Sequence, residues 1–118
     1  MALKLKSTRH AAALDYAMNK IKSSVLEPYI NDVILFGSCA RREEKFSSDV
    51  DLLLVLKLEY FAHPELKKIL RLLKSDITSD DIRDPEVDLK IVVGEDQWKN
   101  SDMSFYKNIA KEGVTLWH

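Results

Sequence analysis

The stretch LFGSCARREEKFSSDVDLLLVL, residues 35–56, contains the strongest structural pattern in the sequence. It opens on the end of an apolar run, breaks at Gly37-Ser38 and, after ten intervening residues, resumes at Asp49-Val50-Asp51 with a second apolar run. Short apolar runs that end at turn residues are typical of buried strands. We therefore predict one strand over residues 33–36 and another over residues 50–58.

Apolar periodicity on both sides of this stretch predicts helices. A stripe with spacings of four, three and four indicates a helix over about residues 8–25 and consists of Leu14, Met18, Ile21 and Val25. A second stripe follows Pro64 and consists of Leu66, Ile69, Leu70, Leu73 and Ile77. We expect Ser101 or Asp102 to cap a last helix that ends before Gly113.

The remaining segments complete a small sheet. Residues 87–93 alternate and then meet Gly94, which predicts a third strand after a polar loop over residues 79–86. Residues 114–117 predict a short final strand. We therefore predict a single α/β (α+β) domain over residues 1–118, a small mixed β-sheet with helices packed mainly on one face.

The composition excludes several classes of protein. Of 118 residues, 46% are hydrophobic and 31% charged, which is typical of a globular chain rather than a disordered one. The formal net charge of -1 gives no general attraction to nucleic acid or acidic membranes, so we expect direct binding to neither. One cysteine excludes an internal disulfide, and no apolar run approaches the roughly 18 residues of a membrane span. We expect a cytoplasmic protein.

Asp49 and Asp51 are the first candidate site residues. Side chains alternate along a strand, so both carboxylates point to one face and repel each other unless a cation neutralises them. Mg²⁺ takes such oxygen ligands together with substrate phosphates, and two ions roughly 3.5–4 Å apart would hold the attacking and leaving oxygens of a phosphoryl transfer. If the strand over residues 87–93 lies alongside, Asp88 joins the pair and accepts a proton from the attacking hydroxyl.

The Gly-Ser break supplies candidate phosphate ligands. Gly37 lacks a Cβ, so a phosphate can approach its backbone, and Ser38 adds a hydroxyl and a backbone N–H. The residues that follow could begin a short helix whose N-terminus attracts a phosphate. Arg41 and Arg42 would add positive charge for a triphosphate.

An Asp-x-Asp pair alone is weak evidence, because paired acids on a strand are often only a solvated face. Two features favour a site here: the strand is otherwise strongly apolar, and the pair follows a Gly-Ser turn. Neither a P-loop nor an EF-hand pattern is present in the sequence. In phosphatases of the haloacid dehalogenase type the apolar strand precedes the acids, whereas here it follows them.

With Gly37-Ser38, ten residues and Asp49-x-Asp51, the chain resembles the DNA polymerase beta-like nucleotidyltransferase superfamily, and its length resembles the minimal nucleotidyltransferase (MNT) branch. The resemblance implies metal ligands at Asp49, Asp51 and Asp88, and phosphate-binding residues at Gly37, Ser38, Arg41 and Ser48. One position departs from the family pattern. Arg42 stands where the family has a customary glycine, which either stiffens the loop or strengthens phosphate binding.

The resemblance also implies an activity, cofactors and a partner. Such enzymes transfer a nucleoside monophosphate from a nucleotide triphosphate to a hydroxyl and release pyrophosphate, so we expect ATP as donor and two Mg²⁺ ions. MNT proteins encoded beside HEPN-domain ribonucleases resemble antitoxins, and some adenylylate a tyrosine of the toxin. Two alternatives stay open: a non-catalytic antitoxin that neutralises a HEPN toxin by binding, and a homodimeric nucleotidyltransferase acting on antibiotics or other small molecules.

Other reactive or bulky residues are given structural roles. Cys39 is better explained as a small turn residue than as a nucleophile. The histidines lack metal-ligand spacing and are expected at the surface or at helix starts; they are His10, His63 and His118. A basic cluster is expected to be a solvated helix face and consists of Lys67, Lys68, Arg71 and Lys74. Late aromatic residues are expected in packing rather than base stacking, namely Trp98, Phe105, Tyr106 and Trp117.

Overall fold

The computed structural model describes residues 5–79, 81 and 83–117, and within them four strands form one mixed sheet in the order β3-β2-β1-β4. The strands are β1 (Ile30–Phe36), β2 (Val50–Leu56), β3 (Val87–Val93) and β4 (Val114–Trp117). β1 runs antiparallel to β2 and to β4, whereas β2 and β3 are parallel. The helix α3 (Leu66–Asp76) connects these parallel strands, which cannot be joined by a tight turn.

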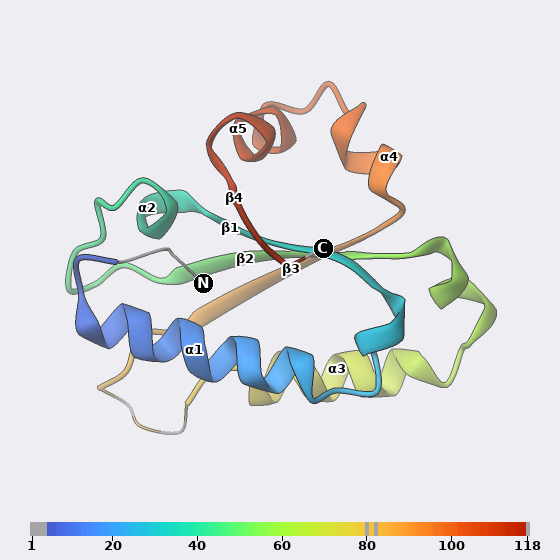
Figure 1. Cartoon of the computed structure of the whole chain (residues 1–118), viewed down its shortest axis with the longest axis horizontal. Coiled ribbons are helices and arrows are strands. Elements are labelled where there is room, and N and C mark those ends of the chain that lie inside the picture. The colour runs from blue at the N-terminus through green and yellow to red at the C-terminus, as the bar shows by residue number, and fades with distance from the viewer. Residues whose placement is uncertain (1–4, 80, 82, 118) are drawn as a thin grey trace.

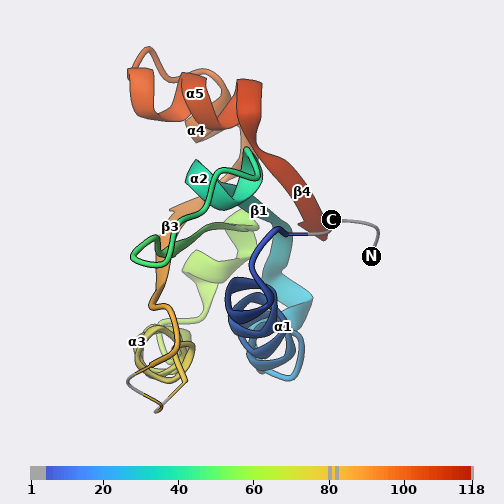
Figure 2. The ribbon, with the colours of Figure 1, turned by 90° about the vertical axis from the view of Figure 1, so that its left-hand side faces the viewer.

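Helices lie on both sides of the sheet. The longer ones, α1 (Thr8–Lys22) and α3, share one face, and α4 (Glu95–Lys99) and α5 (Ser104–Glu112) lie on the other (Figure 1). The side view in Figure 2 shows the same layers, with α2 (Gly37–Ala40) near α5. The predicted α/β class and mixed sheet are confirmed; the two longer helices share one face, and the shorter helices cover the other.

β2 is the centre of both cores, because its side chains alternate between the two faces. Leu52, Leu54 and Leu56 pack with the residues of α1 and α3, and Leu53 and Val55 pack with Trp98 and Ile109 of the other layer. The five β2 residues are completely buried. Burial of each side chain contributes roughly 1.5–3 kcal/mol to the stability of the fold relative to an exposed side chain, so β2 is a major source of that stability.

Several element ends differ from the sequence prediction, and β1 begins at Ile30 rather than at residue 33. α1 ends at Lys22 rather than at residue 25, because Ser23 folds back and its hydroxyl donates to the carbonyl of Asn19 at 2.8 Å. Val25 is consequently 63% exposed, and the fully buried Leu26 takes its place in the core. β2 likewise stops at Leu56, since the chain turns into a 3₁₀-helix over Leu58–Ala62.

The C-terminal helices also differ from the prediction. α4 was not predicted, and it buries Trp98 against the sheet. The last helix begins at Ser104, because the hydroxyl of Ser101 accepts a hydrogen bond from the nearby Met103 N–H at 3.2 Å instead of capping a helix. Its end at Gly113 and the short strand after it are as predicted.

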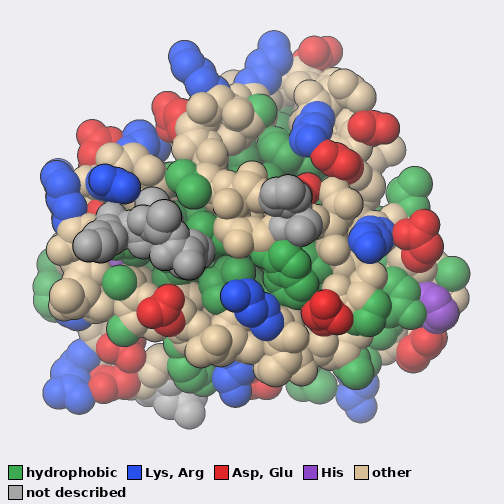
Figure 3. All heavy atoms as spheres, viewed as in Figure 1, with side chains coloured by type: hydrophobic (Ala, Val, Ile, Leu, Met, Phe, Trp, Pro, Cys, Tyr) green, Lys and Arg blue, Asp and Glu red, His purple; other side chains and the backbone are tan. Residues whose placement is uncertain are grey.

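The described part of the chain contains no helix that is both long and apolar enough to cross a membrane. Figure 3 shows one face of the molecule, on which acidic and basic side chains are interspersed rather than segregated. This mixture agrees with the small formal net charge of -1.

Candidate active site

A row of side chains crosses three strands at one end of the sheet. Asp51 pairs in register with Asp88 on β3 and with Phe36 on β1. Neighbouring strands lie roughly 4.8 Å apart and paired residues share a face, so the two carboxylates are side by side. They lie on the face that carries α4 and α5. Asp51 is half-buried, whereas Asp88 and Asp49 are exposed.

The carboxylates influence one another electrostatically. Burial, together with the negative charges of Asp88 and Asp49, raises the pKa of Asp51 from its ordinary value to about 6. Lys90 and Arg41 partly offset this effect. The structure therefore places Asp51 beside Asp88, with Asp49 near enough to act on it electrostatically, in an environment that disfavours the ionised form of Asp51.

Gly37 makes the close approach of Asp51 possible. Its backbone φ of +75° lies in the left-handed region, which favours glycine. A Cβ at this position would lie only 2.4 Å from Oδ2 of Asp51, where no side chain fits. Glycine is therefore required twice at this position, once by the backbone and once by the neighbouring carboxylate.

The carboxylate oxygens are suitable ligands for a hard divalent cation. Within residues 5–79, 81 and 83–117, no three acidic, histidine or cysteine side chains stand close enough together to enclose a metal by themselves. Mg²⁺ does not need such a cage, because it usually binds one or two carboxylates and takes its other ligands from water and substrate phosphates. A half-buried Asp51 beside two like charges is the kind of site whose repulsion a cation relieves.

Lys90 lies on the same side of β3 as Asp88, two residues further along. Its Nζ is 3.5 Å from Oδ2 of Asp88, and both side chains are about half exposed. An exposed pair of this kind contributes little to stability. The Lys90 ammonium therefore partly balances the negative charge of Asp88.

Arg41 ends the single turn of α2 and is held by two acidic residues. Its Nε lies 2.7 Å from Glu43 Oε1, and its Nη1 lies 3.3 Å from Glu112 Oε2 at the end of α5. A phosphate would have to compete with these partners for Arg41. α2 has only four residues, so its dipole adds little to phosphate binding.

The backbone conformation at Arg42 is one that favours glycine, the residue customary at this position in the family that the sequence resembles. Its φ of 57° makes it the non-glycine residue with a left-handed backbone in the described part of the chain. A side chain in this conformation costs about 1–2 kcal/mol, which a glycine avoids. Arg42 is exposed and its guanidinium has no ion pair among the described residues, so its charge is available to a ligand.

Ser48 and His10 fix the loop before Asp49. The Ser48 hydroxyl accepts a hydrogen bond from the Lys45 N–H at 2.9 Å, so it supports a turn. His10 Nε2 donates to the Ser48 carbonyl at 2.7 Å, and Nδ1 accepts from the Ser7 hydroxyl at the same distance. The expectation that His10 lies at a helix start is confirmed, but it is fully buried rather than at the surface.

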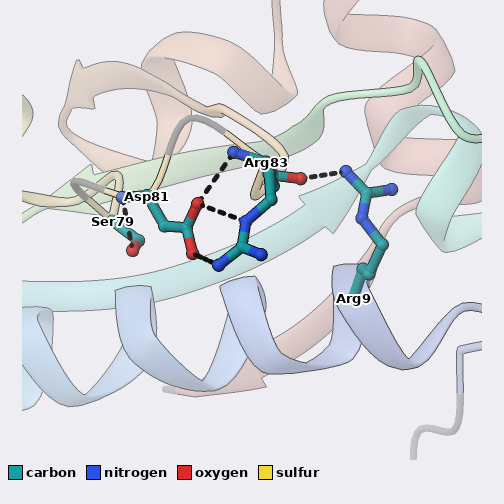
Figure 4. A network of polar contacts seen from close by, with 4 residues as sticks. All are labelled: Arg9, Ser79, Asp81 and Arg83. Atoms are coloured by element: carbon teal, nitrogen blue, oxygen red, sulfur yellow. Dashed lines mark hydrogen bonds and ion pairs between the residues drawn. The ribbon is translucent and has the colours of Figure 1, made fainter.

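The N-terminal end of α1 also contacts the loop before Asp88. Arg9 Nη2 donates to the Arg83 carbonyl at 2.5 Å, and Arg83 forms a two-armed ion pair with Asp81 (Figure 4). Arg9 also covers the Phe46 ring at 4.1 Å from its centroid. One helix end therefore holds both loops that lead to the carboxylates. We call it the α1 clamp, made of Ser7, Arg9 and His10.

Cys39 is not a nucleophile in this structure. Burial, together with the negative charges of Glu44, Asp51 and Asp49, raises the pKa of its thiol to about 11. Its Sγ lies 3.6 Å from the Asp49 carbonyl, to which it donates. The thiol is therefore a buried packing group, as the sequence suggested.

Sequence reasoning missed the α1 clamp and Glu112. A histidine near a helix start carries no sign of the loop it contacts, which lies 38 residues away. Of the other histidines, His63 is partly exposed and lies 3.3 Å from Glu65, and His118 is outside the described residues. The Ser-x-x-His spacing of Ser7 and His10 was the one local signal, since Ser7 caps α1.

Known proteins provide an independent comparison. A crystal structure described as a nucleotidyltransferase from Sulfolobus solfataricus is 21% identical, with a TM-score of 0.44, and covers 95% of this chain and 89% of its own. A toxin-antitoxin crystal structure with AMP-PNP is 21% identical, with a TM-score of 0.48, over 87% of this chain and 71% of its own. At these values neither likeness identifies a substrate or partner for this chain.

No curated protein sequence matches the chain significantly. The family model named "Polymerase beta, Nucleotidyltransferase" matches residues 19–118, which include the Gly37 turn and all three carboxylates. This match covers most of the chain and agrees with the mixed sheet and with the row of acidic residues. The chain belongs to the polymerase beta nucleotidyltransferase family.

Proposed function

We propose that this chain transfers AMP from ATP to a hydroxyl group, and that the acceptor is a tyrosine of a HEPN-domain partner. The observation that carries the reaction type is the in-register pair Asp51 and Asp88, with Asp49 nearby and the Gly37 turn in contact. Family membership supports a transferase in general. The identity of donor, acceptor and partner rests on the resemblance of the sequence to the MNT branch.

In this mechanism the donor phosphates lie along Gly37 and Ser38, beside the carboxylates. Asp49, Asp51 and Asp88 would hold two Mg²⁺ ions, which supply Lewis-acid stabilisation of the phosphate charge. Arg42 adds a positive charge near the same turn. Asp51 is the least exposed of the three acids, so its charge is screened least by water.

The chemical step is a single displacement at the α-phosphorus. The acceptor oxygen forms a bond to the α-phosphorus while the bond to the oxygen bridging the α- and β-phosphates breaks, and pyrophosphate leaves with that electron pair. The hydroxyl proton passes to Asp88, which acts as general base. The product is a phosphodiester on the acceptor.

The test is label transfer from α-phosphate-labelled ATP with Mg²⁺, in the presence of the protein encoded by the neighbouring gene. We expect label on that protein, and a loss of at least about 100-fold in the Asp49→Asn/Asp51→Asn double variant. Asp15→Asn is a matched control, since Asp15 is an exposed carboxylate on α1, on the other face of the sheet. It should transfer label at the wild-type rate.

Two outcomes contradict the proposal. If the double variant forms the complex and still neutralises the partner, and no label is transferred by the wild type, the protein acts as a binding antitoxin. If wild-type protein alone labels a small hydroxyl compound such as an aminoglycoside and never a protein, the acceptor is a small molecule.

A further inference from the structure

A cavity of about 180 Å³ lies beside the candidate active site, under α5. Its lining comes from the end of β1, from α2 and from α5, and consists of Phe36, Gly37, Arg41, Phe105, Asn108, Ile109 and Glu112. Pockets that enclose a whole small-molecule ligand usually measure roughly 300–1,000 Å³. This one is therefore sized for one end of a nucleotide, with the rest lying outside it.

Two aromatic rings line the cavity. The Phe36 and Phe105 rings meet edge to face, with centroids 5.5 Å apart. Phe105 is 39% exposed, although it lies on the same helix as the buried Ile109. Because every nucleobase has a π-face, a ring left partly open in this way is a stacking surface for a base.

The cavity also has a polar group suited to a base edge. The side-chain amide of Asn108 can donate and accept hydrogen bonds, and it has no partner among the described residues. The other polar residues, Arg41 and Glu112, are already paired with each other at 3.3 Å. Their contact joins α2 to α5 and holds the two walls of the cavity together.

The register of the three strands indicates whether the cavity receives the donor nucleotide or the acceptor. Phe36, Asp51 and Asp88 stand in register on β1, β2 and β3, so the cavity at Phe36 and the base Asp88 are at opposite ends of the row. An acceptor must reach Asp88 to lose its proton. The Gly37 turn, where the phosphates are proposed to lie, contacts the cavity directly.

We propose that this cavity receives the nucleobase of the donor nucleotide, stacked on Phe105 and contacted at its edge by Asn108. The inference rests on the proposed function, because it takes the phosphates to lie at Gly37. It adds a second role to the packing of Phe105 against Phe36 and Tyr106. Stacking tolerates any base, so Phe105 supplies affinity, and Asn108 supplies the discrimination among bases.

The test is calorimetric binding of ATP, GTP, CTP and UTP, each with Mg²⁺, and of Mg²⁺-tripolyphosphate, which has phosphates but no base. The variants are Phe105→Ala, Phe105→Tyr and Asn108→Ala. Phe61→Ala is the matched control, because Phe61 is an exposed phenylalanine in the 3₁₀-helix beyond the other end of β2. Thermal melting verifies that each variant is folded.

We expect Phe105→Ala to bind all four nucleotides roughly 5- to 100-fold more weakly and tripolyphosphate unchanged, as the loss of a base-stacking contact requires. Phe105→Tyr should retain wild-type affinity because it keeps the ring. Asn108→Ala should change the ratio of affinities among the four nucleotides. Phe61→Ala should bind every ligand as the wild type does.

Two results would overturn the inference. One is wild-type affinity for all nucleotides in folded Phe105→Ala, and the other is an equal loss for nucleotides and tripolyphosphate, which would place the effect at the phosphates. The proposed function fails separately. It fails if the wild-type protein binds neither tripolyphosphate nor any nucleotide, whereas the cavity inference alone fails if nucleotides bind without dependence on Phe105.

Discussion

The two faces of the sheet are built from alternate residues of the same strand, yet they differ in how completely they are covered. On the face under α1 and α3, Leu52, Leu54 and Leu56 are all completely buried. On the opposite face, Leu53 and Val55 of β2 are equally buried, but the first β2 side chain on this face, Asp51, is only half-buried. The first face is a closed core along the whole strand, and the second is closed only where α4 and α5 cover it.

The difference shows how one strand combines stability with chemistry. A two-residue period places every even-numbered β2 residue in the closed core, so the strand is fixed whatever happens on the other face. Asp51 can then remain in an unfavourable environment, with a pKa of about 6, without the fold depending on it. We therefore expect substitutions on the α1/α3 face to change mainly stability, and substitutions at the site on the other face to change mainly activity.

The largest expected effect is on the closed face. Leu54→Ala removes a completely buried side chain and should lower the free energy of unfolding by about 2–5 kcal/mol, measured by urea denaturation. Label transfer per folded molecule should stay at the wild-type level. Leu72→Ala, an exposed leucine of α3, is the control and should change stability little. A transfer rate more than about tenfold lower in folded Leu54→Ala would show that the faces are not separate.

The next effect tests the α1 clamp, which links the closed layer to the open site. His10→Phe keeps a buried ring but removes the hydrogen bonds to Ser7 and Ser48, which should cost about 1–3 kcal/mol in the free energy of unfolding. Because the loop before Asp49 loses its anchor, label transfer should also fall, under conditions where the variant is fully folded. His63→Phe, at a partly exposed histidine, should leave both quantities unchanged. Unchanged transfer in His10→Phe would limit the clamp to a role in stability.

A smaller effect should appear in the pH dependence of stability without metal. The folded pKa of Asp51, about 6, lies above its ordinary value of 3.8, so the folded state holds this proton more tightly than the unfolded chain does. Its contribution to stability is therefore fully present below about pH 4 and is lost as pH rises through 6. In EDTA, the stability of the wild type should fall across this range relative to Asp51→Asn.

Mg²⁺ distinguishes this explanation from a general pH effect. Adding Mg²⁺ at pH 7 should raise the melting temperature of the wild type more than that of Asp51→Asn, because a bound cation relieves the carboxylate repulsion. If Asp51→Asn shows the same pH dependence as the wild type in EDTA, Asp51 is not the group responsible.

The sequence predicts the closed face well and the organisation of the open one only in part. Apolar runs determine β2 and β3, and the Asp49-x-Asp51 spacing identifies acids that the strand pairing then brings to Asp88. What could not be predicted depends on contacts distant in the chain. The His10 contact with Ser48 spans 38 residues and the Arg41 contact with Glu112 spans 71, and no local pattern encodes either.

The smallest expected effect concerns Arg42, which has a left-handed backbone at a position where the family has glycine. Arg42→Gly removes a left-handed strain of about 1–2 kcal/mol but increases the entropy of the unfolded chain by about 0.5–1 kcal/mol, so a net gain of roughly 0.5–1 kcal/mol in stability is expected. Arg42→Ala keeps the Cβ and should show no such gain, although it loses the same charge. Urea denaturation gives the stabilities, and tripolyphosphate binding gives the charge effect. If both variants bind tripolyphosphate more weakly while only Arg42→Gly is more stable, the arginine is retained for phosphate binding at a cost in backbone strain. If binding is unchanged in both, the strain at this position has no counterpart in phosphate binding.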